Sequence, residues 1–199
     1  MIEEIIALDS KIFLFLNNLG NNNFDDFWIF MSKTSLIVSF NLLILIYFLL
    51  NKPFKSSIYK YRYIFTIIII SLIMVTISDQ IPNIFKDTIM RFRPCHDESI
   101  QNLVRLVKEN CGGKYGFFSA HASNSFSAAI FLGLLLKELN YKTIYITLIF
   151  ASLVSYSRVY LGVHYPLDII FGALFGLLNG TLFYKILKNL IKFKLSNKL

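Results

Sequence analysis

The chain has 199 residues, of which 55% are hydrophobic and only 16% are charged, whereas about 25% are charged in ordinary soluble domains. Its mean hydropathy of +0.58 argues against a water-soluble domain and excludes a disordered chain, because disorder goes with low hydrophobicity. The net charge of +8 would suit nucleic acid. Apolar blocks of membrane-spanning length favour anionic lipid instead, so we expect no nucleic-acid partner.

The first 20 residues mix charged and apolar positions. Residues 2–19 carry Glu3, Glu4, Asp9 and Lys11 between apolar side chains. This pattern predicts an amphipathic helix that lies in the membrane interface, with a short sixth span as the alternative. A signal peptide is not expected, because the segment has no basic first region and no small-residue cleavage site.

Five later blocks are apolar enough to cross a membrane, since about 20 helical residues cover a hydrocarbon core of about 30 Å. We therefore predict an all-α membrane protein, a helical bundle of five transmembrane helices that forms a single domain over residues 1–199. The polar, irregular stretch at 83–117 is expected to be an external loop. The predicted spans are residues 27–50, 63–82, 118–136, 143–161 and 165–187.

The distribution of lysine and arginine predicts the orientation. Residues 51–62, 137–142 and 185–199 hold 11 of the 20 basic residues, opposed only by Glu138. Cytoplasmic loops carry such an excess, so the 83–117 loop and the 157–168 connection are expected outside a bacterial inner membrane. The cytoplasmic basic residues are Lys52, Lys55, Lys60, Arg62, Lys137, Lys142, Lys185, Lys188, Lys192, Lys194 and Lys198.

Polar residues at the external ends of the spans indicate a phosphate-binding cage. Lys86 and Arg93 lie seven residues apart, two helical turns, and Arg158 ends the fourth span. Arginine forks match phosphate oxygens, and lysine acts as a point charge. Ser119 is placed to cap the third span, whose N-terminus favours an anion. Three cations around a small volume repel one another unless an anion lies among them.

Two histidines accompany these cations. His164 and Asp168 are spaced i and i+4, so the carboxylate can hold one imidazole nitrogen and leave the other free to attack. His121 follows Ser119 by two residues. Histidine is the usual general acid and can serve as a nucleophile, so the pattern predicts both roles.

These segments resemble the three signature motifs of the type 2 phosphatidic acid phosphatase (PAP2) superfamily. In the second motif, Phe118 and Ala120 stand where the family has proline and glycine. A methyl group at residue 120 would interfere only if the backbone needed a positive φ there. The matching residues are Lys86, Arg93 and Pro94 in the first motif, Ser119 and His121 in the second, and Ser157, Arg158, His164 and Asp168 in the third.

The resemblance implies a phosphatase that needs no metal and no other cofactor. By this resemblance, His164 attacks phosphorus and forms a phosphohistidine, and Asp168 orients His164. His121 protonates the leaving oxygen and then activates water. The residues implied to bind the phosphoryl oxygens are Lys86, Arg93, Ser119 and Arg158.

The substrate implied by the resemblance is a lipid phosphate whose tails stay in the bilayer. Undecaprenyl diphosphate and the phosphates of lipid A are favoured, with phosphatidylglycerol phosphate and phosphatidic acid as further candidates. Two alternatives remain: a lipid phosphotransferase on the same scaffold, and a non-catalytic lipid or anion carrier, which needs no nucleophile. No obligate protein partner is implied.

The remaining loop residues carry weaker signals. Cys95 and Cys111 are predicted to close a disulfide over the mouth of the site in an oxidising compartment, with two free thiols as the alternative. Only His96 lies near them, so a zinc site is not expected. We expect four further cations to be solvated or to contact lipid headgroups: Arg91, Arg105, Lys108 and Lys114.

Small residues recur every four positions on two spans. Gly172, Gly176 and Gly180 do so on the last span, and Ser123 and Ser127 on the third. Such stripes let helices approach closely. They predict tight packing inside the bundle, with a dimer contact as the alternative for the glycines.

Overall fold

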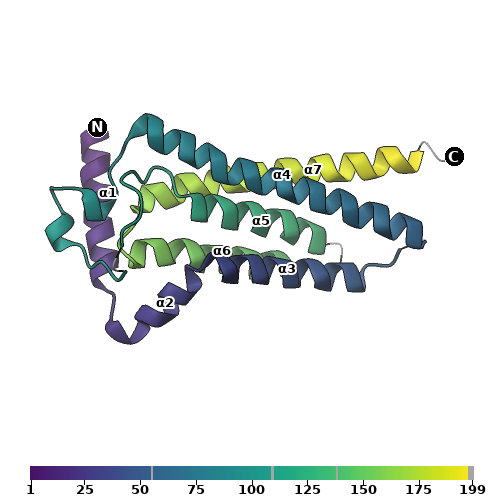
Figure 1. Ribbon diagram of the computed structural model, residues 1–199, viewed down its shortest axis with the longest axis horizontal. Helices are drawn as coiled ribbons and strands as arrows, with labels where there is room; N and C mark the ends of the chain where they lie inside the picture. Colours follow the sequence, from purple (N-terminus) through teal and green to yellow (C-terminus); the bar gives the residue numbers. More distant parts are fainter. Residues whose placement is uncertain (55, 109, 138, 197–199) are drawn as a thin grey trace.

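The computed structural model describes residues 1–54, 56–108, 110–137 and 139–196, with side chains up to residue 191. Within these residues the regular structure is helical apart from one isolated bridge between Phe92 and Tyr115, which confirms the all-α prediction. Helices α3 to α7 run along the long axis, and α1 (Ile2–Asn18) crosses one end of the bundle at a steep angle (Figure 1). This crossing matches an interfacial helix better than a sixth span.

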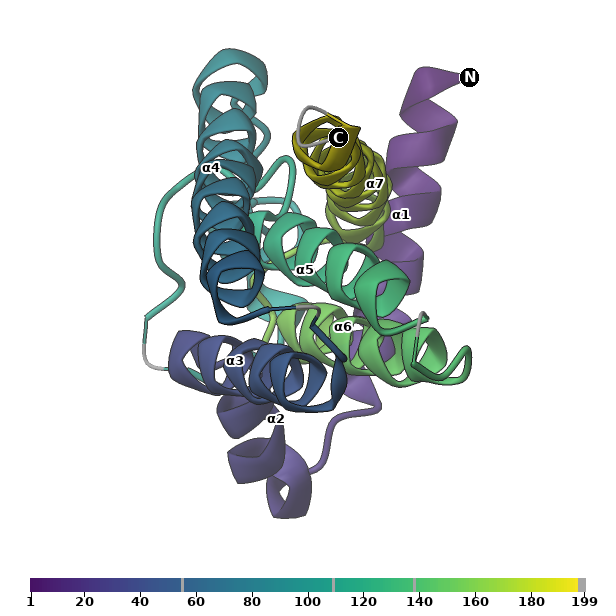
Figure 2. The ribbon, with the colours of Figure 1, turned by 90° about the vertical axis from the view of Figure 1, so that its right-hand side faces the viewer.

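Among the described helices, four are long and apolar enough to span a membrane. The remaining predicted span, 118–136, is α5 (Ala120–Leu136), which is apolar but has only 17 residues, about 25 Å of helix. It lies in the middle of the bundle (Figure 2), and eleven of its residues are buried. The four longer helices are α3 (Thr34–Asn51), α4 (Ser57–Ile89), α6 (Thr143–Tyr160) and α7 (Pro166–Ser196).

The predicted span at 27–50 is wrong in its first part. The chain forms a short helix α2 (Asp25–Met31), breaks, and begins α3 at Thr34. Lys33 has an extended backbone at the break. Ser32 is buried there, and its hydroxyl accepts a hydrogen bond from Arg158 of α6. Ser32 at the break therefore turns inward to meet a buried cation, whereas Lys33 beside it is exposed.

The predicted span at 63–82 is too short, because α4 continues to Ile89 and the external loop begins at Met90 instead of residue 83. Three polar residues near the end of α4 recur at helical spacing: Asp79, Asn83 and Lys86. The Lys86 Nζ donates to Asn83 Oδ1 at 2.9 Å. Polar side chains on one face of a long helix thus resembled a loop in sequence.

A proline inside α4 fastens this helix to α5. Proline has no backbone N–H, so Pro82 cannot donate to the carbonyl of Ser78. The hydroxyl of Ser123 on α5 donates to that carbonyl instead, at 2.9 Å. The cross-helix bond lies two residues after His121 and fixes the depth of α5 beside α4.

The glycine stripe of α7 packs on the backbone of α5, which confirms the in-bundle prediction. A Cβ atom added at Gly172 would lie 2.6 Å from the carbonyl oxygen of Ser119. Added carbons at Gly176 and Gly180 would collide with the carbonyl oxygens of Ser123 and Ser127. Only glycine allows this approach, so the stripe sets the distance between two helices that carry site residues.

The alternating helix directions separate the two ends of the bundle. The loops after α3 and α5 and the end of α7 lie opposite α1, whereas the 90–119 loop and the α6–α7 turn lie at the α1 end (Figure 1). The basic segments predicted to be cytoplasmic are thus grouped at one end. Lys55, Glu138 and Lys198 lie outside the described residues.

Replacing Gly176 by alanine tests the helix contact. The added methyl group collides with backbone, which cannot rotate away, so we expect a destabilisation of about 1–3 kcal/mol. The measurement is the melting temperature in detergent. Gly113→Ala is the matched control, because nothing lies within 4 Å of its added carbon; equal melting of the two variants would contradict the contact.

Candidate active site

The three sequence motifs meet at the α1 end of the bundle. Lys86 lies in the last turn of α4 and Arg158 in the last turn of α6, while α5 begins just after Ser119. His164 occupies the turn between α6 and α7, and Asp168 lies in the first turn of α7. Successive helices run in opposite directions, so these distant segments share one depth.

His164 and Asp168 pair as their spacing predicts. The His164 Nδ1 lies 3.3 Å from Asp168 Oδ2, which leaves Nε2 free. The same carboxylate oxygen accepts the backbone N–H of Tyr165 at 3.0 Å. His164 is 2% exposed and Asp168 is fully buried, so the imidazole is held in one orientation inside the protein.

The predicted cations surround this imidazole. Burial, followed by the charges of Arg93, Arg158 and Lys86, lowers the pKa of His164 well below its ordinary value of 6.5. A neutral imidazole is the form that can act as a nucleophile. Burial and the three cations together therefore keep the nucleophile candidate unprotonated.

Arg93 is positioned by loop backbone. Its Nε donates to the carbonyl of Tyr115 at 3.2 Å and its Nη1 to that of Cys111 at 3.1 Å. Its own N–H donates to the carbonyl of Lys114 at 3.1 Å. The loop between α4 and α5 thus folds back on the first motif and holds its arginine.

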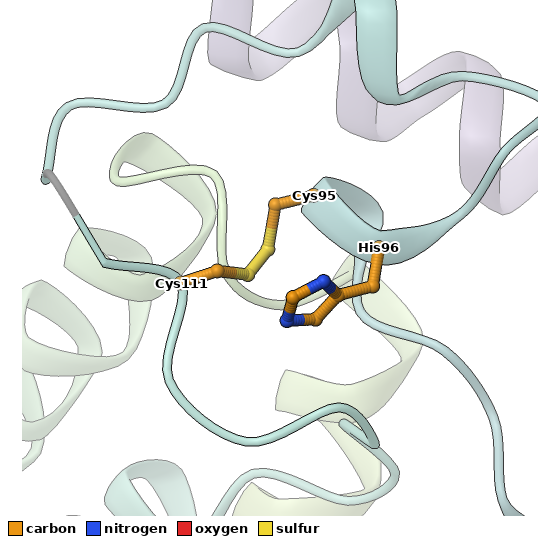
Figure 3. Close-up of side chains that lie close together, drawn as sticks. All are labelled: Cys95, His96 and Cys111. Atoms are coloured by element: carbon orange, nitrogen blue, oxygen red, sulfur yellow. A yellow bond between two sulfur atoms is a disulfide. The ribbon is translucent and has the colours of Figure 1, made fainter.

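The structure joins Cys95 and Cys111 in a disulfide (Figure 3), with Cα atoms 6.3 Å apart. His96 lies beside the bond, and potential ligand atoms of the three residues lie within 4.8 Å of one another. The sulfurs are bonded to each other, so they offer no thiolate for a metal. The bridge closes the loop that carries the acceptors of Arg93.

A residue that the sequence did not indicate links Arg158 with His121. The Arg158 Nη1 donates to the hydroxyl of Ser32, and the backbone of Ser32 contacts the His121 imidazole. His121 also lies within electrostatic reach of His164. The Arg158 Nε is buried without a partner among the described residues, so the guanidinium keeps a donor free for an anion.

Ser119 caps α5 as predicted. Its hydroxyl accepts the N–H of Ala122 at 3.4 Å, and its own N–H donates to the carbonyl of Asp168 at 3.0 Å. Ala120 is the first helical residue. Its φ is not positive, since Met90 is the only non-glycine with a positive φ in the described chain. Alanine therefore fits where the family motif has glycine.

The prediction that Arg91 is a solvated cation is wrong. Its Nη1 donates to Asp168 Oδ1 at 3.0 Å and its Nη2 to Asp9 Oδ2 at 2.6 Å. The guanidinium also stacks over the ring of Tyr165, 4.1 Å from its centroid. Arg91 thus links the acid of the third motif to helix α1.

Helix α1 braces the turn that carries His164. Asp9 Oδ1 accepts the N–H of Leu167 at the start of α7, at 2.9 Å. Asn17 Nδ2 donates to the carbonyls of Val159 and Tyr160 at the end of α6, at 3.2 and 2.9 Å. Asp9 and Asn17 are buried and lie on one face, two turns apart. In the sequence, the spacing of these two polar residues on one helix face was the pattern that could have indicated their role.

Two other loop cations also differ from the expectation of solvated charge. Arg105 pairs with Asp25 at 2.7 Å, and its backbone N–H donates to Asn17 Oδ1 at 2.8 Å. Lys108 is half-buried. Burial and then the charges of Arg158 and Lys33 lower its pKa, which places it beside the cage. Lys114 is exposed, as expected.

A groove of about 430 Å³ between α3, α4 and α5 reaches His121. Its walls are mostly apolar, with Ile37, Leu45 and Phe131 among the lining residues. Asp79 and Asn124 add polar groups on the side near His121. Pockets of this size and character suit the apolar part of an amphipathic ligand.

The match to a family model decides the classification. Residues 60–192 match the model of the PAP2 superfamily. The chain belongs to this superfamily. It is 32% identical over 185 residues to a lipid A 4'-phosphatase of Porphyromonas gingivalis, covering 92% of this chain and 75% of the relative. A lipid A 4'-phosphatase of Bacteroides thetaiotaomicron is 35% identical over 188 residues, covering 94% and 80%.

Solved PAP2 structures share the fold. The PAP2 type phosphatidylglycerolphosphate phosphatase of Bacillus subtilis matches with a TM-score of 0.69 and 18% identity, covering 94% of this chain and 87% of that one. Aquifex aeolicus LpxE matches with a TM-score of 0.55 and 20% identity, covering 88% and 93%. Taken with the relatives, this PAP2 protein is a multi-pass membrane enzyme, a lipid phosphatase.

Replacing Asp9 by alanine tests the brace. The change leaves Arg91 half-paired and the N–H of Leu167 without its acceptor, so we expect a destabilisation of about 2–4 kcal/mol. Melting in detergent measures it. The control is Glu4→Ala on the same helix, because Glu4 is exposed and pairs only with the chain terminus. A melting temperature for Asp9→Ala equal to that of the control would rule out the brace.

Proposed function

We propose that this PAP2 protein hydrolyses a phosphate monoester on a glucosamine-based lipid of the lipid A class and releases inorganic phosphate. The carrying observation is the His164–Asp168 pair inside three cations, next to an apolar groove that reaches His121. The relatives named as lipid A 4'-phosphatases favour this lipid over undecaprenyl diphosphate. The Lys-rich end of the bundle supports an inner-membrane location with the site facing the periplasm.

In the first step, His164 Nε2 attacks phosphorus and the bond from phosphorus to the ester oxygen breaks. Asp168 accepts the hydrogen bond from Nδ1 and balances the charge that forms on the imidazole. Lys86, Arg93 and Arg158 stabilise the charge on the phosphoryl oxygens, in the manner of preorganised donors. Ser119 lies beside them at the start of α5. His121 donates its proton to the leaving oxygen of the lipid.

In the second step, water attacks the phosphohistidine. His121, now neutral, takes a proton from that water, and the bond from phosphorus to nitrogen breaks. Inorganic phosphate leaves and His164 returns to its neutral state. Charge neutralisation in both steps comes from side chains of the chain itself, so the proposal requires no metal.

Phosphate release from a lipid panel tests the proposal. We expect the purified protein, with EDTA present, to release phosphate from lipid A more efficiently than from undecaprenyl diphosphate, phosphatidylglycerol phosphate or phosphatidic acid. His164→Ala removes the nucleophile, and we expect at least about a 1,000-fold loss of kcat. Retained activity in this variant would refute the phosphohistidine step. Labelled phosphate appearing on an acceptor lipid instead of in solution would indicate a phosphotransferase.

The pH dependence tests the state of His164. Its lowered pKa keeps the imidazole neutral at pH 6.5 and above, so protonation of His164 reduces kcat/KM only below pH 6.5. The profile is measured from about pH 4 to pH 9. Phosphorus NMR of the lipid alone gives the ionisation of the substrate, which is then separated from that of the enzyme. An enzyme-linked acid limb centred above pH 6.5 would contradict the lowered pKa of His164.

A further inference from the structure

We propose that Asp79 and Asn124 form a specificity site that reads hydrogen-bond donors on the leaving group, and that this site favours a sugar phosphate over a diphosphate. The inference rests on the proposed function. Both residues line the groove that reaches His121. Neither belongs to the three motifs.

The two side chains form a polar pair between helices. Asn124 Nδ2 on α5 donates to Asp79 Oδ1 on α4 at 3.3 Å. Asn124 Oδ1 is buried without a partner among the described residues. Among the described residues, the hydrogen bond to the second oxygen of Asp79 is a long one of 3.4 Å from the neighbouring Gln80. The pair therefore keeps acceptor capacity toward a groove that is otherwise mostly apolar.

The position of the pair places it on the leaving-group side of phosphorus. Asn124 lies three residues after His121, one helical turn along the same face of α5. In the proposed mechanism His121 protonates the leaving oxygen, so the remainder of the lipid extends from phosphorus toward this face. Asp79 lies seven residues before Lys86 on α4, so it is two helical turns away from this cation of the cage. The atoms next to the ester oxygen thus meet the Asp79–Asn124 pair.

The chemistry of the pair selects among the candidate lipids. A sugar carries hydroxyl and amide donors on the carbons near its phosphate, and these satisfy the free acceptors of Asp79 and Asn124. Phosphatidic acid offers no such donor. The leaving group of a diphosphate is itself an anion, which the Asp79 carboxylate repels. An ionisable side chain at membrane depth is costly, and its presence there indicates a functional role. Recognition of a polar headgroup is the role that we infer for Asp79.

The experiment compares selectivity between variants. We measure kcat/KM for lipid A, undecaprenyl diphosphate and p-nitrophenyl phosphate with the wild type, Asp79→Asn and Asn124→Ala. Loss of one charge-assisted hydrogen bond is expected to lower the ratio of lipid A to p-nitrophenyl phosphate by about tenfold. Asp79→Asn is also expected to raise activity on undecaprenyl diphosphate relative to lipid A. Thr76→Ala on α4, outside the groove lining, is the control and keeps both ratios.

The outcomes separate this inference from the proposed function. Unchanged ratios in both variants, with a wild type that hydrolyses lipid A, overturn the specificity site alone. A wild type that releases phosphate from p-nitrophenyl phosphate but not from lipid A refutes the proposed function. A variant that merely misfolds loses both activities together and melts earlier than Thr76→Ala. In that case the milder Asn124→Gln, which keeps both the amide donor to Asp79 and the amide acceptor, decides: a restored ratio supports the site, and a lost ratio in a folded protein overturns it.

Discussion

Three cations held around one imidazole, at the α1 end of the helical bundle, impose the main physical constraint on this protein. Lys86, Arg93 and Arg158 repel one another, and burial makes each more costly. The structure meets this cost with partners that are themselves fixed. Asn83 accepts from Lys86, loop carbonyls accept from Arg93, and Ser32 accepts from Arg158. These contacts hold the cage in place before any phosphate enters it.

Close helix packing supplies the rigidity that the cage needs. The glycine stripe of α7 lies on the backbone of α5, and Ser123 of α5 bonds the carbonyl that Pro82 leaves free on α4. Both contacts lie within two turns of His121. In a bilayer, where lipid is as apolar as a leucine side chain, such packing and interhelical hydrogen bonds drive association. The position of His121 is therefore set by the contacts of α5 with α4 and α7 inside the bundle.

The crossing helix α1 holds the turn that carries His164. The turn with His164 joins two antiparallel helices. Without α1, backbone groups at the end of α6 and the start of α7 would lack hydrogen-bond partners, because helix termini leave such groups unpaired. Asp9 binds the start of α7, Asn17 binds the end of α6, and Arg91 joins Asp9 to Asp168. Helix α1 thus contacts both termini, and through Arg91 it also holds Asp168, which pairs with His164.

The helical membrane class, the motif residues and their gathering at one end could all be predicted from the sequence, because apolar length, residue type and alternating direction are local or additive properties. The sequence also indicated the His164–Asp168 pair and the Ser119 cap, whose partners lie within one turn. It misplaced the start of α3, because two polar residues did not mark a break in an otherwise apolar stretch. It misplaced the end of α4, because polar residues on a helix face resemble loop residues until their partners are known. Only the tertiary structure decided the roles of Asp9, Arg91, Ser32 and the Asp79–Asn124 pair. Each of these depends on a partner 45 or more residues away, and no local pattern specifies which distant segment a buried polar group will meet.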